Sequence, residues 1–277
     1  MSQQLTNQFE EQQEEELSEE NQEENFKVDT LEELEPFIQS MNSGPNLFIC
    51  VQRYDKQLHN INLSSYKCQK DQRIYFTLKQ NNLVIDLMQK FQNLIQLDLK
   101  LREIKIQQQD IQELTQIIAK IKTLNDLTLN LVLNNLSGPS GTYLFESLSQ
   151  WAHLKKLEID VGATSLGDEG VIKLGKGLEN LTNLINLKLG VYTNKLTNQG
   201  AAELGSSLSK ILNLRTLDID LCSNDITSLL GFANNLIQCH KLAYFFIMAY
   251  GNNDFVQINK TFIKSKSLVR FVEIYDF

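Results

Sequence analysis

Histidine and cysteine are the side chains of this 277-residue chain best suited to nucleophilic, acid–base or zinc chemistry. Such sites need several of these residues at a characteristic spacing, and the chain has no C-x-x-C motif. Cys239-His240 has no second pair at metal-ligand spacing. We therefore predict no metal and no cofactor, and we expect reduced cysteines that pack as small apolar side chains. The residues concerned are His59, His153, His240, Cys50, Cys68, Cys222 and Cys239.

Catalytic sequence motifs are missing as well. The chain contains no G-x-x-x-x-G-K-[ST], G-x-G-x-x-G, G-x-S-x-G or H-E-x-x-H sequence. Two glycine-rich tetrapeptides, 138–141 and 167–170, occupy equivalent places in successive sequence repeats, where glycine and aspartate are expected to enter and cap helices. His153 and His240 each stand just before a predicted strand and are interpreted as turn residues. The sequence thus predicts no catalytic residue and no enzyme.

A repeated strand pattern organises the chain. Segments of the form L-x-x-L-x-L, with isoleucine or valine at some positions, begin at positions 94, 124, 154, 184 and 214, and the interval between them is constant. Shorter intervals lead to further copies at 242 and 269, and alternation at Ile74 and Phe76 indicates a first, degenerate copy. Apolar residues at alternate positions predict strands with one buried face, and the constant interval indicates an internal repeat.

Apolar residues recur at helical spacing between these strands. Each group predicts an amphipathic helix of about three turns. One strand and one helix per repeat predict a parallel sheet with helices on one side, and the wider helical layer would curve the stack with the strands inside. The groups are Ile111, Leu114, Ile117, Ile118 and Ile121; Tyr143, Leu144, Leu148 and Trp151; Val171, Leu174, Leu178 and Leu181; and Ala201, Leu204, Leu208 and Ile211.

The L-x-x-L-x-L strands and the sequence N-x-L-x-x-x-G-A-x-x-L over 194–204 resemble leucine-rich repeat proteins of the long-repeat, ribonuclease-inhibitor type. The resemblance covers about residues 70–277. It implies an α/β leucine-rich repeat solenoid, a curved horseshoe with parallel strands on the concave face and helices on the convex face. The asparagine of the family pattern stands two residues later here, and we expect its buried amide to pair with turn backbone. The positions are Asn134, Asn194, Asn224 and Asn252, with threonine at Thr164.

The charge distribution separates a tail from a body. The formal net charge is -8, and residues 1–26 hold nine glutamates but no lysine or arginine. Residues 1–27 are predicted to be a disordered acidic tail, either solvating or docking on a basic partner. Residues 28–70 are interpreted as an N-terminal cap, with a helix over 28–42 and a strand over 47–51. Residues 71–277 form the predicted array of about eight repeats.

Composition excludes several classes of function. Without its tail the chain is close to neutral, which argues against nucleic acid as a partner. It has no apolar run long enough to cross a membrane, and its N-terminus lacks the basic start and apolar centre of a signal peptide. We therefore expect a cytoplasmic protein that does not act on membranes.

The strand residues between the leucines are expected to point away from the core and to form a surface. One part of this surface is acidic and would steer a basic protein partner, and the other part is apolar and would anchor it. The alternative is that the last two repeats cap the array and C-terminal side chains cover the aromatics. The acidic residues are Glu158, Asp160, Asp218 and Asp220, and the apolar ones are Tyr244, Phe246, Met248, Phe271 and Tyr275.

These observations favour a non-enzymatic protein–protein interaction module, or a structural subunit of a larger intracellular assembly, that binds through its concave strand face. The resemblance also implies two alternatives. Leucine-rich repeat proteins of this shape include activators of the Ran GTPase, so regulation of a small GTPase is one. The other is the detached targeting part of a family whose longer members carry a kinase domain.

Overall fold

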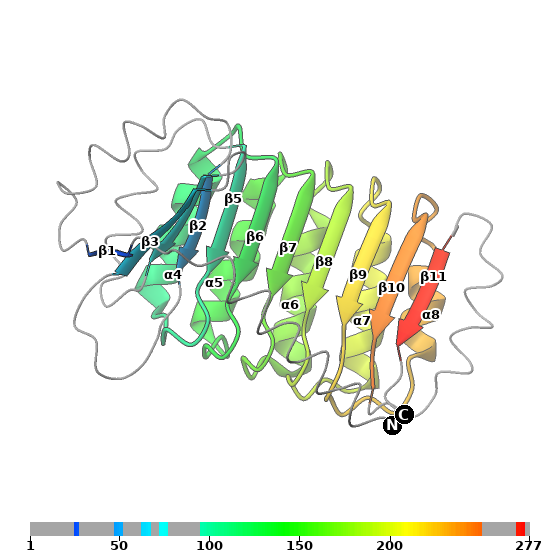
Figure 1. Cartoon of the computed structure of the whole chain (residues 1–277). Coiled ribbons are helices and arrows are strands. Elements are labelled where there is room, and N and C mark those ends of the chain that lie inside the picture. Colours follow the sequence, from blue (N-terminus) through cyan, green and yellow to red (C-terminus); the bar gives the residue numbers. More distant parts are fainter. Residues whose placement is uncertain are drawn as a thin grey trace, which may run out of the picture.

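A computed structural model describes residues 95–250 throughout, and outside this range it describes the backbone of five strands, at 25–27, 47–51, 62–67, 72–76 and 270–274. In these parts of the chain eleven strands form a single sheet, in the order β1-β3-β4-β2-β5-β6-β7-β8-β9-β10-β11 (Figure 1). From β5 onward each strand pairs in parallel with the next one in the chain. These strands are β5 (Gln96–Lys100), β6 (Asp126–Asn130), β7 (Lys156–Asp160), β8 (Asn186–Gly190), β9 (Thr216–Asp220), β10 (Tyr244–Met248) and β11 (Arg270–Ile274).

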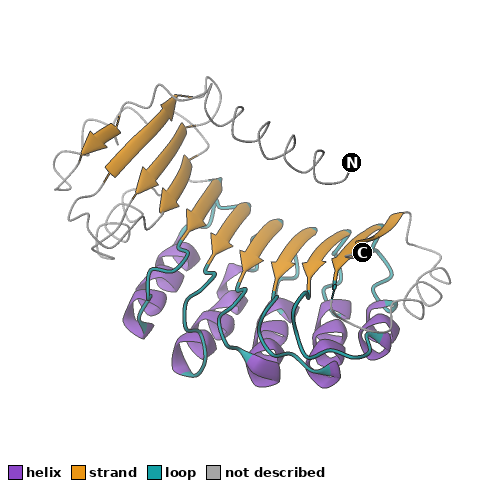
Figure 2. Ribbon diagram, turned by 60° about the horizontal axis from the view of Figure 1, so that its bottom comes forward, coloured by secondary structure: helices purple, strands orange, loops and turns teal. Residues whose placement is uncertain are grey.

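Helices alternate with the strands from β5 to β10 and lie on one face of the sheet (Figure 2). The protein is therefore an α/β fold of repeated strand–helix units, as predicted. The four apolar groups expected on these helices are buried, except Tyr143, which is 43% exposed. Adjacent helical residues point about 100° apart, so Tyr143 does not share the core with Leu144. The helices are α4 (Gln108–Lys120), α5 (Pro139–Ser147) with the 3-10 turn η1 (Leu148–Trp151), α6 (Gly167–Glu179), α7 (Asn198–Ser209) and α8 (Leu230–Leu236).

The constant repeat length sets the strand register and builds the core. Equivalent apolar residues pair from strand to strand and form two columns that pack against the helices. Every member is at most 2% exposed. The first column is Leu97, Leu127, Leu157, Leu187, Leu217 and Phe245, and the second is Leu99, Leu129, Ile159, Leu189, Ile219 and Ile247.

A polar column follows the strands, and we call Asn134, Thr164, Asn194 and Asn224 the Asn ladder. The Asn194 amide nitrogen donates to the carbonyls of Val161, at 2.8 Å, and Tyr192, at 3.1 Å. Its oxygen accepts from the backbone N–H groups of Thr164 and Leu166. Asn134 and Asn224 bond the turns in the same way. The predicted pairing of buried amides with turn backbone is thus confirmed, except at Asn252, which lies outside the described residues.

The N-terminal strands do not follow the order of the sequence in the sheet. Beyond β5 come β2 (Leu47–Val51), β4 (Gln72–Phe76), β3 (Asn62–Lys67) and β1 (Asn25–Lys27). The strand at 47–51 is confirmed, but it lies between β5 and β4, where the degenerate repeat of Ile74 was expected to adjoin β5. At the end of the predicted acidic tail, β1 pairs antiparallel with β3, and disorder of the tail stays a prediction. The helix predicted over 28–42 lies outside the described residues.

The register of β11 differs by one residue from the repeat pattern. The pattern aligns Val272 with Phe245, whereas the backbone pairs Phe271 with Phe245. The same shift pairs Glu273 with Ile247 and Ile274 with Met248, so the backbone pairing does not follow the apolar alternation of this strand. The observed register does not group Phe271 with Tyr244 and Phe246.

Candidate functional site

The sheet face opposite the helices, which we call the open face, is the candidate site (Figure 2). It consists of the first, third and fifth residues of β5 to β10. These residues are exposed or half-buried, except Gly190, while their strand neighbours are buried. The prediction that they point away from the core is confirmed for these six strands.

The four predicted acidic residues come together on β7 and β9. Glu158 pairs in register with Lys188, and Lys188 with Asp218. Asp160 likewise pairs with Gly190, and Gly190 with Asp220. Since strands are spaced at about 4.8 Å, the two acidic strands stand about 10 Å apart across β8. We call Glu158, Asp160, Asp218 and Asp220 the acidic patch.

One lysine compensates part of this charge. Lys188 Nζ lies 2.9 Å from Glu158 Oε1. The hydrogen bond to Glu158 raises the pKa of Lys188, with smaller contributions from Asp218 and Asp160. Within residues 95–250, the carboxylates of Asp160, Asp218 and Asp220 form no ion pair of 4.0 Å or less. Most of the patch charge is therefore not neutralised by the described residues.

Burial makes this charge costly. It raises the pKa of Asp160, and the neighbouring Asp220 and Glu158 add to the increase. The N–H of Gly162, which donates to Asp160 Oδ1 at 3.0 Å, opposes it. Burial also raises the pKa of Asp218, where Lys188 opposes the effect. These carboxylates are held where a nearby cation would be favourable.

The apolar end of the open face lies beside the acidic patch. Tyr244, Phe246 and Met248, which we call the apolar column, are half-buried on β10. Phe246 pairs in register with Asp218, and Met248 with Asp220. The expected aromatic end is thus present for three residues. The side chain of Phe271 and the whole of Tyr275 lie outside the described residues.

Two pairs of side chains elsewhere on the open face satisfy each other. Lys156 Nζ lies 3.0 Å from Asp126 Oδ2, so β6 and β7 share an ion pair at their first positions. The Thr216 hydroxyl donates to Asn186 Oδ1 at 2.8 Å. Groups that satisfy each other in this way offer a partner less than the acidic patch does.

Sequence reasoning missed two glycines that shape the patch. A Cβ on Gly190 would lie 2.6 Å from Asp160 Oδ1, so the carboxylate leans over this glycine. A Cβ on Gly162 would overlap the ring of Tyr192, which covers it at the end of the strands. Burial and the charge of Asp160 raise the pKa of Tyr192. The repeat interval places each glycine beside the residue that covers it, but it does not give the direction of that side chain.

The cysteines and histidines of the described range do not form a reactive site. Cys222 is 3% exposed, and burial together with a hydrogen bond to Asp220 raises its pKa to about 12, so the thiol stays protonated. Burial also raises the pKa of the Cys239 thiol. Both cysteines pack as predicted. His153 and His240 lie in turns, and burial lowers the pKa of His153. His59, Cys68 and the side chain of Cys50 lie outside the described residues.

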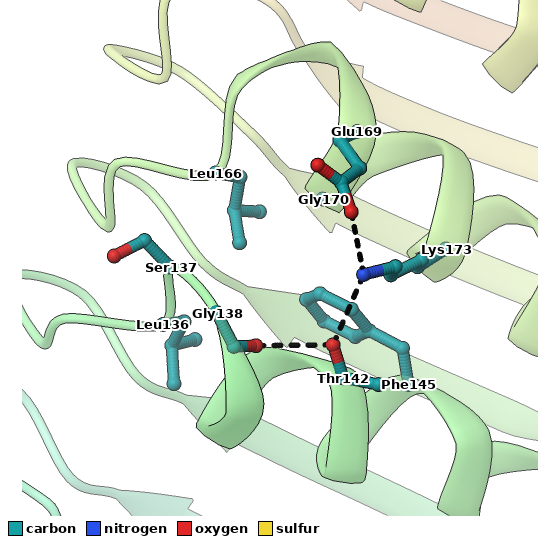
Figure 3. A pocket seen from close by; sticks show the side chains of 9 residues that line it. All are labelled: Leu136, Ser137, Gly138, Thr142, Phe145, Leu166, Glu169, Gly170 and Lys173. Carbon is teal, nitrogen blue, oxygen red and sulfur yellow. Dashed lines mark hydrogen bonds and ion pairs between the residues drawn. The ribbon is translucent and has the colours of Figure 1, made fainter.

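A small hollow of about 70 Å³ lies on the helical side, between the start of α5 and α6 (Figure 3). Lys173 points toward it, but its amine donates to Thr142 Oγ1 at 3.2 Å and pairs with Glu169 at 2.8 Å. Pockets that hold small-molecule ligands are usually several times larger. The hollow is therefore a packing gap with a satisfied lysine. The glycine tetrapeptides beside it lie at the start of α5 and α6, as expected, but the expected capping by a side chain is absent at both helices, whose N-cap residues are Gly138 and Leu166.

Searches among known proteins gave no relative: no family model and no curated protein matches the chain. In the described range, no three His, Cys, Asp or Glu residues could hold a metal ion together. No described helix is long and apolar enough to cross a membrane. Any function assigned to the chain therefore depends on the geometry of the open face.

Proposed function

We propose that this chain is a leucine-rich repeat solenoid of the long-repeat type that acts as a non-enzymatic protein-binding module or as a structural subunit of a larger intracellular assembly. The strand–turn–helix unit, which recurs at a constant interval, and the Asn ladder support the assignment to this repeat class. A layer of strands backed by wider helices gives such proteins an inner surface on which partners bind.

The observation that carries the proposal is the apolar column beside the acidic patch on the sheet face opposite the described helices. Exposed tyrosine, phenylalanine and methionine are the residue types that anchor protein interfaces. A flanking field of one charge sign sets partner choice and orientation. On residues 95–250, the face joins both features within neighbouring strands.

The test is affinity capture from native extract with chemical cross-linking, using the wild type and the double variant Tyr244→Ala with Phe246→Ala. We expect the double variant to lose the captured partner, because its interface anchors are removed. The matched control is Tyr143→Ala, which removes an exposed tyrosine from the helical side. In the wild type, cross-links should join the partner to Lys188 and Lys241, near the apolar column.

Capture by a correctly folded double variant would show that the open face is not the binding surface. Circular dichroism and thermal unfolding establish that both variants fold. Cross-links confined to the helices would give the same conclusion. If a small GTPase is captured, stimulation of its GTP hydrolysis tests the regulatory alternative.

A further inference from the structure

We propose that the segment bound on the open face is a cationic, amphipathic peptide of the partner protein, with arginine or lysine over the acidic patch and an apolar side chain on the apolar column. This inference rests on the proposed function, and it adds the chemistry and the register of the partner. It commits to a protein segment, since a nucleic-acid phosphate would be repelled by the same carboxylates.

The charge balance of the open face favours a cation. Acids outnumber lysines on β5 to β10, and two of the lysines are engaged in ion pairs within the face. Four acids of the face lie outside these two pairs, and three of them, Asp160, Asp218 and Asp220, lie together on β7 and β9. The acids of the face are Asp98, Asp126, Glu158, Asp160, Asp218 and Asp220, and the lysines are Lys100, Lys156 and Lys188.

The carboxylate of Asp160 leans from β7 over Gly190, where a Cβ would lie 2.6 Å from its Oδ1, and so reaches toward Asp220 on β9. A guanidinium or ammonium group that lies above this carboxylate could bond both aspartates, because such a group carries several charged donors. Each aspartate also accepts one backbone N–H, from Gly162 and Cys222 respectively, which orients it.

The apolar contact lies one strand further on. Met248 is the register partner of Asp220, so the apolar column begins about 4.8 Å from the acidic patch. A partner must therefore present a cation and an apolar side chain about 5–10 Å apart. Residues i and i+3 or i+4 of a helix, or i and i+2 of an extended strand, have suitable spacing. Partial burial strengthens the attraction compared with a fully exposed pair.

The experiment uses the full chain and three synthetic amphipathic peptides of the same length as probes. The first contains leucine and arginine, the second replaces arginine by glutamate, and the third replaces leucine by serine. Fluorescence anisotropy measures each affinity at low and at physiological salt. We expect the leucine–arginine peptide to bind best, the glutamate peptide not to bind, and the serine peptide to bind weakly.

The protein variants test the register. The double variant Asp160→Asn with Asp220→Asn keeps the oxygen that accepts each backbone N–H. It should lower the affinity for the leucine–arginine peptide at least about tenfold. Glu146→Gln with Glu203→Gln removes the same charge from exposed helical positions and should leave the affinity within about twofold. An equal loss of affinity in both double variants would show long-range electrostatic attraction without a defined binding site. This result would overturn the inference.

The outcome separates this inference from the proposed function. If the Asp160 and Asp220 double variant binds the leucine–arginine peptide as the wild type does, or if the glutamate peptide binds equally well, the cationic segment is excluded. The proposed function then still stands wherever Tyr244→Ala with Phe246→Ala abolishes partner capture. The inference and the proposed function are both supported if two double variants lose peptide binding and the Glu146 and Glu203 control does not. These double variants are Asp160→Asn with Asp220→Asn and Tyr244→Ala with Phe246→Ala.

Discussion

The Asn ladder and the open face share the same repeat interval. They differ in how much the residue type changes from one repeat to the next. The ladder keeps an amide or hydroxyl at each turn, because the turn backbone needs the same partner in every repeat. The equivalent open-face positions hold Glu158, Lys188, Asp218 and Phe246 in successive strands. A residue type that recurs at the same position of each repeat therefore indicates a structural role. A residue type that varies between repeats indicates a position that is available for recognition.

The two regions also differ in whether their polar groups are satisfied. Asn194 is fully buried, and both ends of its amide are hydrogen-bonded. Asp160 and Asp218 are half-buried, their pKa values are raised, and they form no ion pair with residues 95–250. The ladder thus contributes to stability, whereas the charges of Asp160 and Asp218 reduce it at neutral pH.

The largest expected effect is on the ladder. Asn194→Ala should lower the free energy of unfolding by about 3 kcal/mol, because it leaves several buried backbone groups without partners. Denaturant unfolding followed by circular dichroism measures this. Asn135→Ala, at an exposed turn position, is the control and should cost less than about 0.5 kcal/mol. Equal losses at both positions would remove the distinction between ladder and surface.

The second largest effect is expected for a glycine within the helical layer, compared with a glycine on the open face. Gly177→Ala should cost about 2 kcal/mol, since its Cβ would overlap the Phe145 carbonyl and push α6 away from α5. Gly190→Ala meets only the carboxylate of Asp160, which can swing aside, and should cost less than about 1 kcal/mol. Thermal unfolding of the two variants checks the order. The reverse order would show that the open face is as tightly packed as the helical layer.

A smaller effect concerns the pH dependence of stability. The pKa of Asp160 is raised in the folded state, so wild-type stability falls as pH rises through that pKa. Asp160→Asn removes this loss, and at neutral pH the variant should be equally or more stable, by less than about 1 kcal/mol. The difference should disappear below the ordinary pKa of aspartate. Denaturant unfolding across acidic and neutral pH measures it.

The Asp160 prediction has a control with the opposite sign. The hydrogen bond to Lys173 lowers the pKa of Glu169, so Glu169→Gln should bring no gain in stability at neutral pH. A clear loss of stability in Asp160→Asn at neutral pH would mean that the carboxylate is better satisfied than the structure indicates.

The smallest effect is expected at Lys188. Its ion pair with Glu158 is more than half exposed on the lysine side, so Lys188→Met should change stability by less than about 0.5 kcal/mol. The same change removes a positive charge from the middle of the acidic patch. It should therefore increase the affinity for the leucine–arginine peptide about two- to fivefold, as measured by anisotropy. Unchanged affinity would place the bound cation away from β8.

Much of the fold and of the site was predictable from local patterns. The strands at 96–100 through 244–248 follow from apolar alternation, and the helices follow from the spacing of residues such as Leu174 and Leu178. The constant repeat interval also places Asp160 and Asp220 on one face, two strands apart. Local reasoning failed at β11, where the backbone pairs Phe271 with Phe245 and Glu273 with Ile247 against the apolar alternation.

The sequence by itself determined the repeat unit, the buried columns and the composition of the open face, because burial in a strand or helix follows a short period that each repeat carries. Only the tertiary structure decided that β2 lies between β4 and β5, that Tyr192 covers Gly162, and that Asp160 leans over Gly190. The physical reason is that strand neighbours and side-chain directions depend on contacts between residues far apart in the chain. Backbone hydrogen bonding is the same for every residue, so it does not by itself select the strand neighbours. Packing of the strand and helix layers selects them.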